Sequence, residues 1–449
     1  MRKRPVDQAR RAAFDALRAV HADGAYANLV LGKILGERRL SGRDAALATE
    51  LVAGTSRLEG TYDLIIAAAA GRKLSSLQPA VLDVLRLGVH QLLSMRVPAH
   101  AAVAATVNLA SATVGERITG LTNAVLRKVA AQDYDAWVAQ LTNGLELGAA
   151  LAVRTAHPQW VVDAYAELLP ADELQPALAA NNVSPQVSLA VRPGLATVDE
   201  LVSAGAVPGR WSPFAAAWSG DPGQLEAVRS SRAGVQDEGS QLVTWALSRA
   251  AAEPGWWLDL CAGPGGKSAL LAGLAAADGS RLLAGELSQH RAALVAGALV
   301  RYGSSSPASV VVADGTRPAW RPGTFSRVLV DAPCSGLGAL RRRPESRWRR
   351  DTAAVEQLHP LQCSLLRSAL DAAAPGGLVA YVTCSPHIRE TTDVVTEVLQ
   401  GRPDTEIEEA AGLLPEVPGA ARGPFLQLWP HRHGTDAMFA AFLRVGPGT

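Results

Sequence analysis

The chain has 449 residues, more than one hydrophobic core usually supports, so two or three domains are expected. Apolar residues make up 48% of it, but no apolar run reaches the ~18 residues of a membrane-spanning helix, and the basic start lacks the apolar core of a signal peptide. The four cysteines have neither disulfide-framework nor zinc spacing, so we expect free thiols and no metal. Without a signal or membrane segment the protein is expected to be cytoplasmic, and we expect a monomer.

The net charge of only +1 argues, taken alone, against a nucleic-acid-binding protein, but the charge is unevenly distributed. Residues 1–145 carry 18 basic and 12 acidic side chains, a balance of +6, whereas residues 146–235 carry 5 and 9, a balance of −4. Six arginines and a tryptophan then occupy the ten positions 341–350. Because phosphate binding depends on local clusters, this distribution keeps RNA binding open.

Residues 1–145 predict an all-helical domain. Apolar residues fall on one face of a first helix, at Val6, Ala9, Ala13, Leu17 and Val20. Residues 80–94 are apolar on nearly every side, which predicts a central helix, and 101–114 and 118–131 predict two more. The short connections are typical of a compact helical bundle.

Residues 146–235 predict a small α+β module between two larger domains. Eight prolines interrupt this segment, and residues 186–191 alternate apolar and polar side chains like a strand.

Residues 236–449 predict a parallel sheet with helices on both faces, because short β-rich runs alternate with helical stretches. The expected strands are 256–261, 281–287, 309–314, 327–332 and 378–384, followed by a closing antiparallel pair at 425–429 and 438–445.

A glycine-rich turn follows the first of these strands, where residues 258–267 read Leu-Asp-Leu-Cys-Ala-Gly-Pro-Gly-Gly-Lys. Its spacing fits neither a Walker A loop nor a dinucleotide fingerprint. Open sheets bind ligands at the carboxyl ends of their strands, and glycines let the backbone approach a ligand. A tight strand-to-helix turn without a ligand is the alternative.

Acidic residues stand at the ends of the next three strands: Glu286, Asp314 and Asp331. Glu286 is placed to accept hydrogen bonds from ribose hydroxyls, and Asp314 from an adenine amino group. One such acid alone is more often a turn residue. The series, together with the glycine loop, favours S-adenosylmethionine as the cofactor.

Two cysteines also follow strands, Cys334 in Asp-Ala-Pro-Cys-Ser and Cys384 in Thr-Cys-Ser-Pro. A cofactor loop with such cysteines suits methyl transfer to carbon 5 of a pyrimidine, since a thiolate must first add to carbon 6 before carbon 5 can attack a methyl donor. For Cys334 and Cys384 the alternative is a buried structural thiol. For Cys261 and Cys363 a buried structural thiol is what we expect.

These motifs carry a resemblance to the Sun/RsmB family of bacterial ribosomal RNA cytosine-5 methyltransferases. The carrying segments are 259–267, 331–336, 342–345 with Trp348, and 383–385. Residues 6–145 resemble the family's NusB-like domain, and residues 150–235 its RRM-like module, including 157–160 and 180–182. The implied architecture is a NusB-like bundle over 1–145, an RRM-like module over 146–235 and a class I methyltransferase domain over 236–449.

The resemblance implies Cys384 as the nucleophile and Cys334 as the residue that assists product release. DNA cytosine methyltransferases use the Pro-Cys cysteine instead, so the reverse assignment stays open. Cofactor contacts carry over to Cys261, Ala262, Gly263, Pro264, Gly265, Gly266, Lys267, Glu286, Asp314 and Asp331. Asp331 is also expected to face the base. The family often has Asp where Glu286 stands, and Glu-Asn where this chain has Glu390-Thr391, which puts the role of that segment in doubt.

The implied substrate is 16S ribosomal RNA or a small-subunit assembly intermediate, with the target base flipped out or already unpaired. We expect RNA contacts from Arg341, Arg342, Arg343, Arg347 and Trp348, although a charge run is often only a solvated surface. A noncatalytic RNA-binding assembly factor with a degenerate methyltransferase fold is the competing function. The intact cysteines and cofactor loop argue against it.

Overall fold

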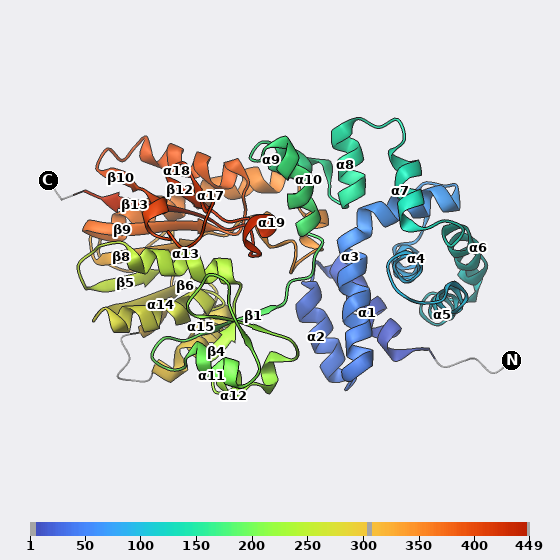
Figure 1. The fold of residues 1–449 in the computed structure, drawn as a ribbon, viewed down its shortest axis with the longest axis horizontal. Helices are drawn as coiled ribbons and strands as arrows, with labels where there is room; N and C mark the ends of the chain where they lie inside the picture. The colour runs from blue at the N-terminus through green and yellow to red at the C-terminus, as the bar shows by residue number, and fades with distance from the viewer. Residues whose placement is uncertain (1–5, 303–307, 447–449) are drawn as a thin grey trace. The chain divides into compact units, whose positions relative to one another are not determined.

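The computed structural model describes residues 6–302 and 308–446, which form two compact units. The first runs to Asn182 and also contains Leu340–Arg349, whereas the second contains Val183–Ala339 and the chain from Arg350 onward. Figure 1 labels their elements. None of the described helices is long and apolar enough to cross a membrane.

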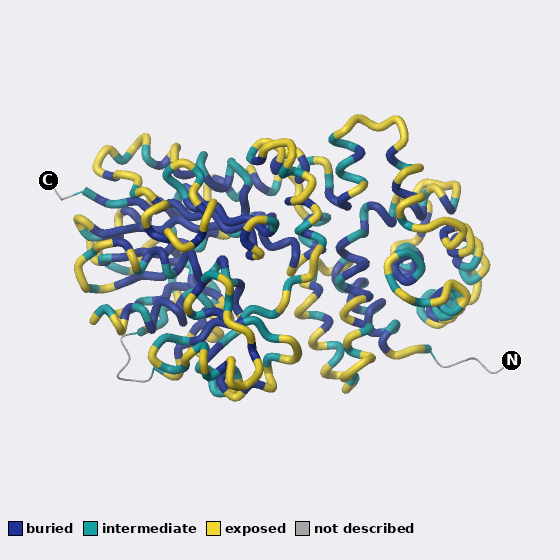
Figure 2. The backbone as a smooth tube through the Cα atoms, in the orientation of Figure 1, coloured by how far each residue is buried: buried dark blue, intermediate teal, exposed yellow. Residues whose placement is uncertain are grey.

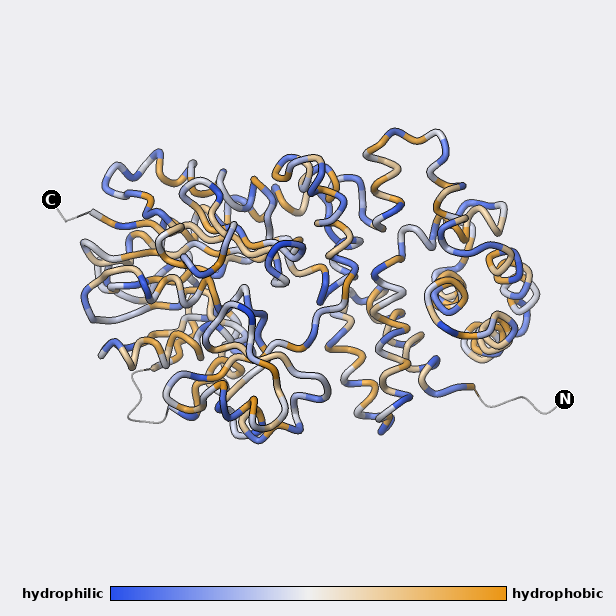
Figure 3. The backbone as a smooth tube through the Cα atoms, viewed as in Figure 1, coloured by the Kyte–Doolittle hydropathy of each residue, from blue (hydrophilic) through white to orange (hydrophobic). Residues whose placement is uncertain are grey.

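The first unit is helical, as its sequence predicts. Its helices are α1 (Gln8–Asp23), α2 (Ala27–Glu37), α3 (Gly42–Ala70), α4 (Pro79–Leu93), α5 (Ala99–Thr113), α6 (Thr119–Val129), α7 (Tyr134–Thr142), α8 (Leu147–Thr155), α9 (Gln159–Ala166), α10 (Ala171–Ala180) and the short α16 (Ser346–Arg349). The expected central helix is confirmed as α4, which packs against α1, α3, α5 and α6. It is largely buried in Figure 2 and largely hydrophobic in Figure 3.

The boundary expected at residue 145 does not coincide with the end of this unit. Helices α8–α10 continue the bundle, because α8 packs on α3 and α7, and Thr61 Oγ1 donates to the Val153 carbonyl at 2.7 Å. These helices were hard to predict, since prolines surround them and none exceeds ten residues.

The second unit begins with a small antiparallel sheet in the order β2-β3-β1-β4. Its elements are β1 (Val187–Val191), β2 (Val207–Pro208), β3 (Ala215–Trp218), β4 (Ala233–Val235), α11 (Val198–Ser203) and α12 (Glu226–Arg229). The strand expected at 186–191 is therefore confirmed. This sheet belongs to the same compact unit as the large sheet that follows.

The large sheet has the order β11-β12-β13-β9-β8-β5-β6-β7, with β10 paired to β13. Its strands are β5 (Trp256–Asp259), β6 (Arg281–Glu286), β7 (Ala308–Val312), β8 (Phe325–Asp331), β9 (Ala373–Thr383), β10 (Thr405–Glu408), β11 (Ala421–Arg422), β12 (Phe425–Gln427) and β13 (Phe439–Val445). The pairs within β9-β8-β5-β6-β7 are parallel, and β13 closes the sheet antiparallel to β9. Every strand expected from the sequence is present.

Helices cover both faces of this sheet, which explains why its strands are apolar on both sides. One face packs on α13 (Glu238–Arg249), α14 (Gly266–Ala277) and α15 (Gln289–Leu299), the other on α17 (Thr352–Ala372) and α18 (Thr392–Leu399). Within β8, Leu329 joins the first core, whereas Val328 and Val330 join the second. The short α19 (Pro430–His433) precedes β13.

Candidate active site

The glycine-rich turn joins β5 to α14 and approaches Glu286 closely. Gly265 has φ +111°, a conformation that strongly favours glycine. A Cβ on Gly263 would lie 2.3 Å from Glu286 Oε2, so a larger residue there would displace the carboxylate. The turn is therefore held against the end of the neighbouring strand β6.

Glu286 and Asp314 lie at the carboxyl ends of β6 and just beyond β7, beside the turn. Glu286 is 4% exposed and accepts the backbone N–H groups of Gly263 at 2.9 Å and Ser288 at 3.0 Å. Asp314 accepts the Thr316 hydroxyl and N–H, which lower the pKa of its carboxyl. Both acids retain lone pairs for further donors. Carboxylates at successive strand ends, beside a backbone that a ligand can approach, fit the hydroxyl and amino groups of an adenosine cofactor.

Asp259 stabilises the glycine-rich turn through a hydrogen bond across it. It was not identified as a site residue from the sequence. It is completely buried, and Oδ2 accepts the Ser268 hydroxyl at 2.6 Å, which joins the end of β5 to the first turn of α14. Burial raises the pKa of Asp259 to about 7, against the lowering effect of Ser268. An acid at the last position of a buried strand was the available signal.

Cys334 and Cys384 meet at the carboxyl ends of the adjacent parallel strands β8 and β9. Asp331 ends β8 and pairs in register with Val382 on β9, and the two cysteines follow. Their sulfur atoms lie 3.4 Å apart. Both side chains are only partly exposed. The structure thus joins two motifs that are 50 residues apart in the chain.

The charges around the two sulfur atoms differ, and they favour Cys384 as the thiolate. Its pKa is lowered because Cys334 donates an S–H hydrogen bond to it and because the Lys267 ammonium is near, although burial and Asp331 oppose this. Lys267 Nζ forms an ion pair with Asp331 Oδ2 at 2.8 Å. Burial acts against the charged form of Lys267, but Asp331 outweighs it, and the pKa of Lys267 is raised. Lys267, expected only as a cofactor contact, therefore also lies beside the nucleophile candidate.

Cys334 has the opposite environment. Its hydrogen bond to Cys384 raises its pKa well above the ordinary value, and burial and the negative charges of Glu390 and Asp331 act in the same direction. In the resting pair, Cys334 is therefore the protonated partner.

Glu390 holds the Cys334 loop, and sequence reasoning left the role of its segment undecided. It is completely buried, and it accepts the Ser335 N–H at 2.7 Å and the Ser335 hydroxyl. Gln362 also donates to it at 3.2 Å, and the Tyr381 hydroxyl donates to its carbonyl at 2.8 Å. The buried carboxylate receives donors from the Cys334 loop and from α17, and the Glu390 carbonyl receives one from β9, so Glu390 fixes the backbone after Cys334.

The residues next to the cysteines also link the two motifs. The hydroxyls of Ser335 and Ser385 lie 3.2 Å apart, and the Gly338 N–H donates to the Cys384 carbonyl at 2.8 Å. A Cβ on Gly338 would lie 2.1 Å from the Ala437 carbonyl oxygen, so this approach requires glycine. Neither Cys261, half-buried in the turn, nor Cys363, fully buried, takes part in the pair.

The arginine-rich segment belongs to the first unit, and its members fall into two groups. Arg342 and Arg343 are exposed, and Arg343 lies over the ring of Tyr26 at 5.0 Å from its centroid. Arg341 is 7% exposed. Phosphate contact stays open for the exposed pair.

The burial of Arg347 goes against the expectation that it contacts RNA, whereas Trp348 is half-buried and its RNA contact stays a prediction. Arg347 is completely buried and donates to the carbonyls of Ala156 at 3.0 Å and Asn181 at 3.2 Å, and to Asn182 Oδ1 at 2.7 Å. Trp348 Nε1 donates to the Ser56 carbonyl at 2.7 Å. Carbonyls at the ends of α8 and α10 have no partner within their helices, and one buried guanidinium can donate hydrogen bonds to several of them.

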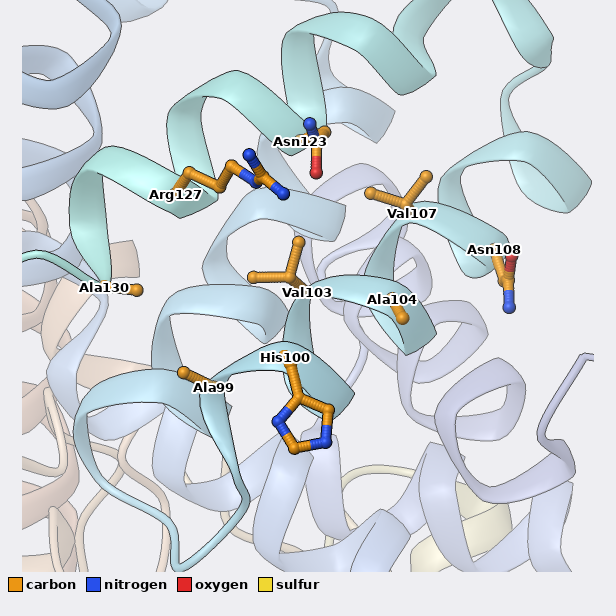
Figure 4. A pocket seen from close by; sticks show the side chains of 9 residues that line it. All are labelled: Ala99, His100, Val103, Ala104, Val107, Asn108, Asn123, Arg127 and Ala130. Carbon is orange, nitrogen blue, oxygen red and sulfur yellow. The ribbon is translucent and has the colours of Figure 1, made fainter.

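A groove between α5 and α6 of the first unit offers further polar groups. Its volume is about 480 Å³, and Figure 4 shows Arg127 and Asn123 on α6 facing it together with Val103 and Val107 of α5. His100 also lines it. Within the described residues, no hydrogen bond or ion pair engages these polar side chains, which leaves them available to a ligand.

Comparison with known proteins matches both units. A model of the RsmB/F family of 16S rRNA methyltransferases matches residues 246–444, and a model of the NusB family matches residues 7–131. A Mycobacterium tuberculosis protein named as a methyltransferase is 50% identical over 453 residues, covering 99% of this chain and 98% of its own. Ribosomal RNA small subunit methyltransferase B of Vibrio cholerae is 31% identical over 446 residues, covering 95% and 97%.

Solved structures support the fold. The crystal structure of PH0851 covers 98% of this chain and 99% of its own, with a TM-score of 0.80 and 21% identity. NSun6 from Pyrococcus horikoshii with SFG covers 65% and 99%, with a TM-score of 0.55 and 16% identity.

Proposed function

Because this chain belongs to the RsmB/F family of S-adenosylmethionine-dependent rRNA methyltransferases, we propose that it methylates carbon 5 of a cytosine in 16S rRNA through a covalent adduct. Cys384 is the nucleophile in this proposal, and Cys334 assists release of the product. The acceptor atom, the adduct and the two roles are the parts that experiments must test.

The chemistry requires one thiolate at the start and a base later. The Cys384 thiolate adds to carbon 6 of the cytosine, which makes carbon 5 nucleophilic enough to take the methyl group of the cofactor. The carbon 5 proton must then leave, and its electron pair expels the Cys384 thiolate. Two groups with different protonation states are therefore needed in one place.

One observation carries the proposal: the sulfur atoms of Cys334 and Cys384 lie 3.4 Å apart, and the pKa of Cys384 is lowered while that of Cys334 is raised. Lys267 favours the charged form of Cys384 at the start. The pKa of Cys334 is raised chiefly by its bond to Cys384. Once Cys384 is bonded to carbon, its negative charge is gone, so the pKa of Cys334 falls. Cys334 then gives up its S–H proton to water, and the resulting thiolate accepts the carbon 5 proton.

The cofactor loop and the acids of β6 to β8 supply the methyl-donor site. The turn at Gly263 and Gly265 offers its backbone, and Glu286 and Asp314 offer carboxylate acceptors for adenosine. When bound, the cofactor supplies an electrophilic methyl group. Lys267 and Asp331, which touch at 2.8 Å, connect this site to Cys384.

RNA contact is proposed for the exposed arginines Arg342 and Arg343 and for the α5–α6 groove, all in the first unit. The balance of +6 over residues 1–145 supports this assignment. The unengaged Arg127 and Asn123 can meet a phosphate and a base edge, respectively. The target cytosine itself must leave any helix to reach a partly buried cysteine pair.

A methyl-transfer assay tests the function directly. Radiolabelled S-adenosylmethionine is incubated with unmodified 16S rRNA, free or in small-subunit particles, and the product is digested to nucleosides. We expect label in 5-methylcytidine with the wild-type enzyme and none with Cys384→Ala. Label at another atom would refute carbon 5 as the acceptor. Bisulfite sequencing of rRNA from a deletion strain would then identify the position.

A further inference from the structure

A second cluster of chemically active side chains lies on α17 and α18, and the proposed reaction does not use it. His359 and Cys363 are four residues apart on α17, so both project from one face of the helix. Glu397 on α18 completes the set. One donor atom from each of the three lies within 4.8 Å of the others.

The hydrogen bonds of His359 leave a place for a cation. Its Nδ1 lies 2.7 Å from the Arg389 carbonyl oxygen, and its Nε2 lies 2.8 Å from Glu397 Oε2. Both partners are acceptors, whereas a neutral imidazole carries one proton. The carbonyl takes the Nδ1 proton, so the Nε2 lone pair faces a carboxylate. Such an arrangement requires a second proton or a metal ion at Nε2.

Cys363 brings a third donor atom to the same place. Its sulfur lies 3.6 Å from His359 Nε2 and also makes a hydrogen bond to Glu397, so the three side chains converge on one point. Zinc bonds of about 2.0 Å to nitrogen and 2.3 Å to sulfur at a tetrahedral angle separate the two atoms by roughly 3.5 Å. The nitrogen-to-sulfur spacing is therefore that of two ligands on one zinc ion.

The third ligand and the surroundings also suit zinc. Tetrahedral geometry needs about 3.3 Å between a nitrogen and an oxygen ligand, so Glu397 must move out by roughly 0.5 Å. Its side chain is 47% exposed and can do so. Its other oxygen stays paired with Arg367 at 3.0 Å. The bond from His359 Nδ1 to a backbone carbonyl is the usual outer contact that orients a zinc-binding histidine.

We propose that His359, Cys363 and Glu397 form a zinc site with an open fourth position for water. It lies apart from the cysteine pair but is connected to it, because the Arg389 carbonyl that orients His359 directly precedes Glu390, which holds Ser335. Zinc would thus tie α17 to α18 and stabilise the segment that positions the Cys334 loop. This revises the sequence-based expectation of no metal, which considered cysteine spacing alone and did not count Glu397, 34 residues after Cys363.

Metal content and affinity test the site. Untagged protein is purified without chelators, its zinc is measured by mass spectrometry, and the stripped protein is titrated with zinc against a chromophoric chelator. We expect one zinc per chain in the wild type. Cys363→Ser and His359→Ala should each weaken zinc binding at least about tenfold, and Glu397→Gln, an exposed change that cannot disturb the core, should also weaken it measurably.

Matched controls separate this site from the catalytic cysteines. Cys384→Ser should retain the zinc affinity of the wild type, and so should Glu406→Gln, which alters an exposed glutamate of β10. With Co²⁺ as the probe, sulfur-to-metal absorption should vanish in Cys363→Ser and persist in Cys384→Ser. Loss of zinc in Cys384→Ser instead would move the metal to the cysteine pair, and equal affinity in all variants, or no zinc binding by the wild type, would overturn the proposal.

Discussion

The sulfur atoms of Cys334 and Cys384 lie 3.4 Å apart, yet Lys267 favours the charged form of one while Glu390 disfavours the charged form of the other. The charges around the pair, together with the hydrogen bond between the two sulfur atoms, thus favour Cys384 as the thiolate. This asymmetry supports the order of events proposed for the reaction, and it leads to the first three predictions below.

The two cysteines should fail at different steps when replaced. Cys384→Ala cannot form the bond to carbon 6, so we expect no activity and no covalent RNA complex. Cys334→Ala should form the adduct and fail to resolve it. A denaturing gel should show a ribonuclease-sensitive protein–RNA conjugate only for Cys334→Ala. The reverse pattern would assign the nucleophile to Cys334, and methylation without either adduct would exclude covalent catalysis.

Removing the cation beside Cys384 should shift the pH dependence of the reaction. Lys267 lowers the pKa of Cys384, so Lys267→Met should raise it, and a higher pH is then needed to form the thiolate. We expect the acid limb of the kcat/KM profile to move to higher pH, so that activity lost at neutral pH is partly recovered in more alkaline buffer. Lys267→Arg keeps the charge and serves as control. An unchanged limb in Lys267→Met would remove Lys267 from thiolate activation.

Glu390 should act as a positioning residue for product release. Glu390→Gln loses one acceptor for the Ser335 donors, at a cost of about 1–3 kcal/mol. We expect a normal first methyl transfer, slow turnover and a conjugate like that of Cys334→Ala. Rapid-quench kinetics would measure the burst. The control Glu406→Gln, at an exposed glutamate on β10, should leave both phases intact. Equal loss of burst and turnover would indicate a general structural role instead.

The arginine-rich segment should separate into RNA-binding and structural members. Arg342→Gln with Arg343→Gln should flatten the salt dependence of RNA affinity by about 0.7 per lost phosphate contact, without a change in Tm. Arg347→Gln should lower stability by roughly 2–4 kcal/mol, because it leaves buried carbonyls without donors. Thermal unfolding and salt-dependent binding measure the two effects. A stable Arg347→Gln protein with a flatter slope would restore Arg347 as an RNA contact.

Glu286 should contribute to cofactor affinity. Glu286→Ala removes the acceptor expected for the ribose hydroxyls and frees the Gly263 N–H, so S-adenosylmethionine binding should weaken by about 1–3 kcal/mol. Isothermal calorimetry measures the change. Glu253→Ala, an exposed acid in the loop before β5, should bind as the wild type does. Unchanged affinity in Glu286→Ala would exclude Glu286 from the cofactor site.

Periodicity and strand-end chemistry were sufficient to predict much of this protein. The parallel strands are largely apolar runs because both faces are buried, and the helix α4 is apolar on nearly every side because other helices surround it. These patterns follow locally from burial, so they can be predicted from a single sequence. The cofactor loop, the strand-end acids and the two cysteines follow from the same logic, since a parallel sheet brings its carboxyl ends to one edge.

Tertiary structure alone decided what each charged residue does. Arg347 and Arg343 are four residues apart in one basic run, yet one is completely buried among carbonyls and the other is exposed. The roles of Lys267 and Glu390 likewise depend on partners 64 and 55 residues away. A sequence states which groups can ionise or donate. The burial of a charged side chain and the nature of its nearest partner determine whether it stabilises the fold or acts in the site. Both are fixed only when distant segments of the chain pack together.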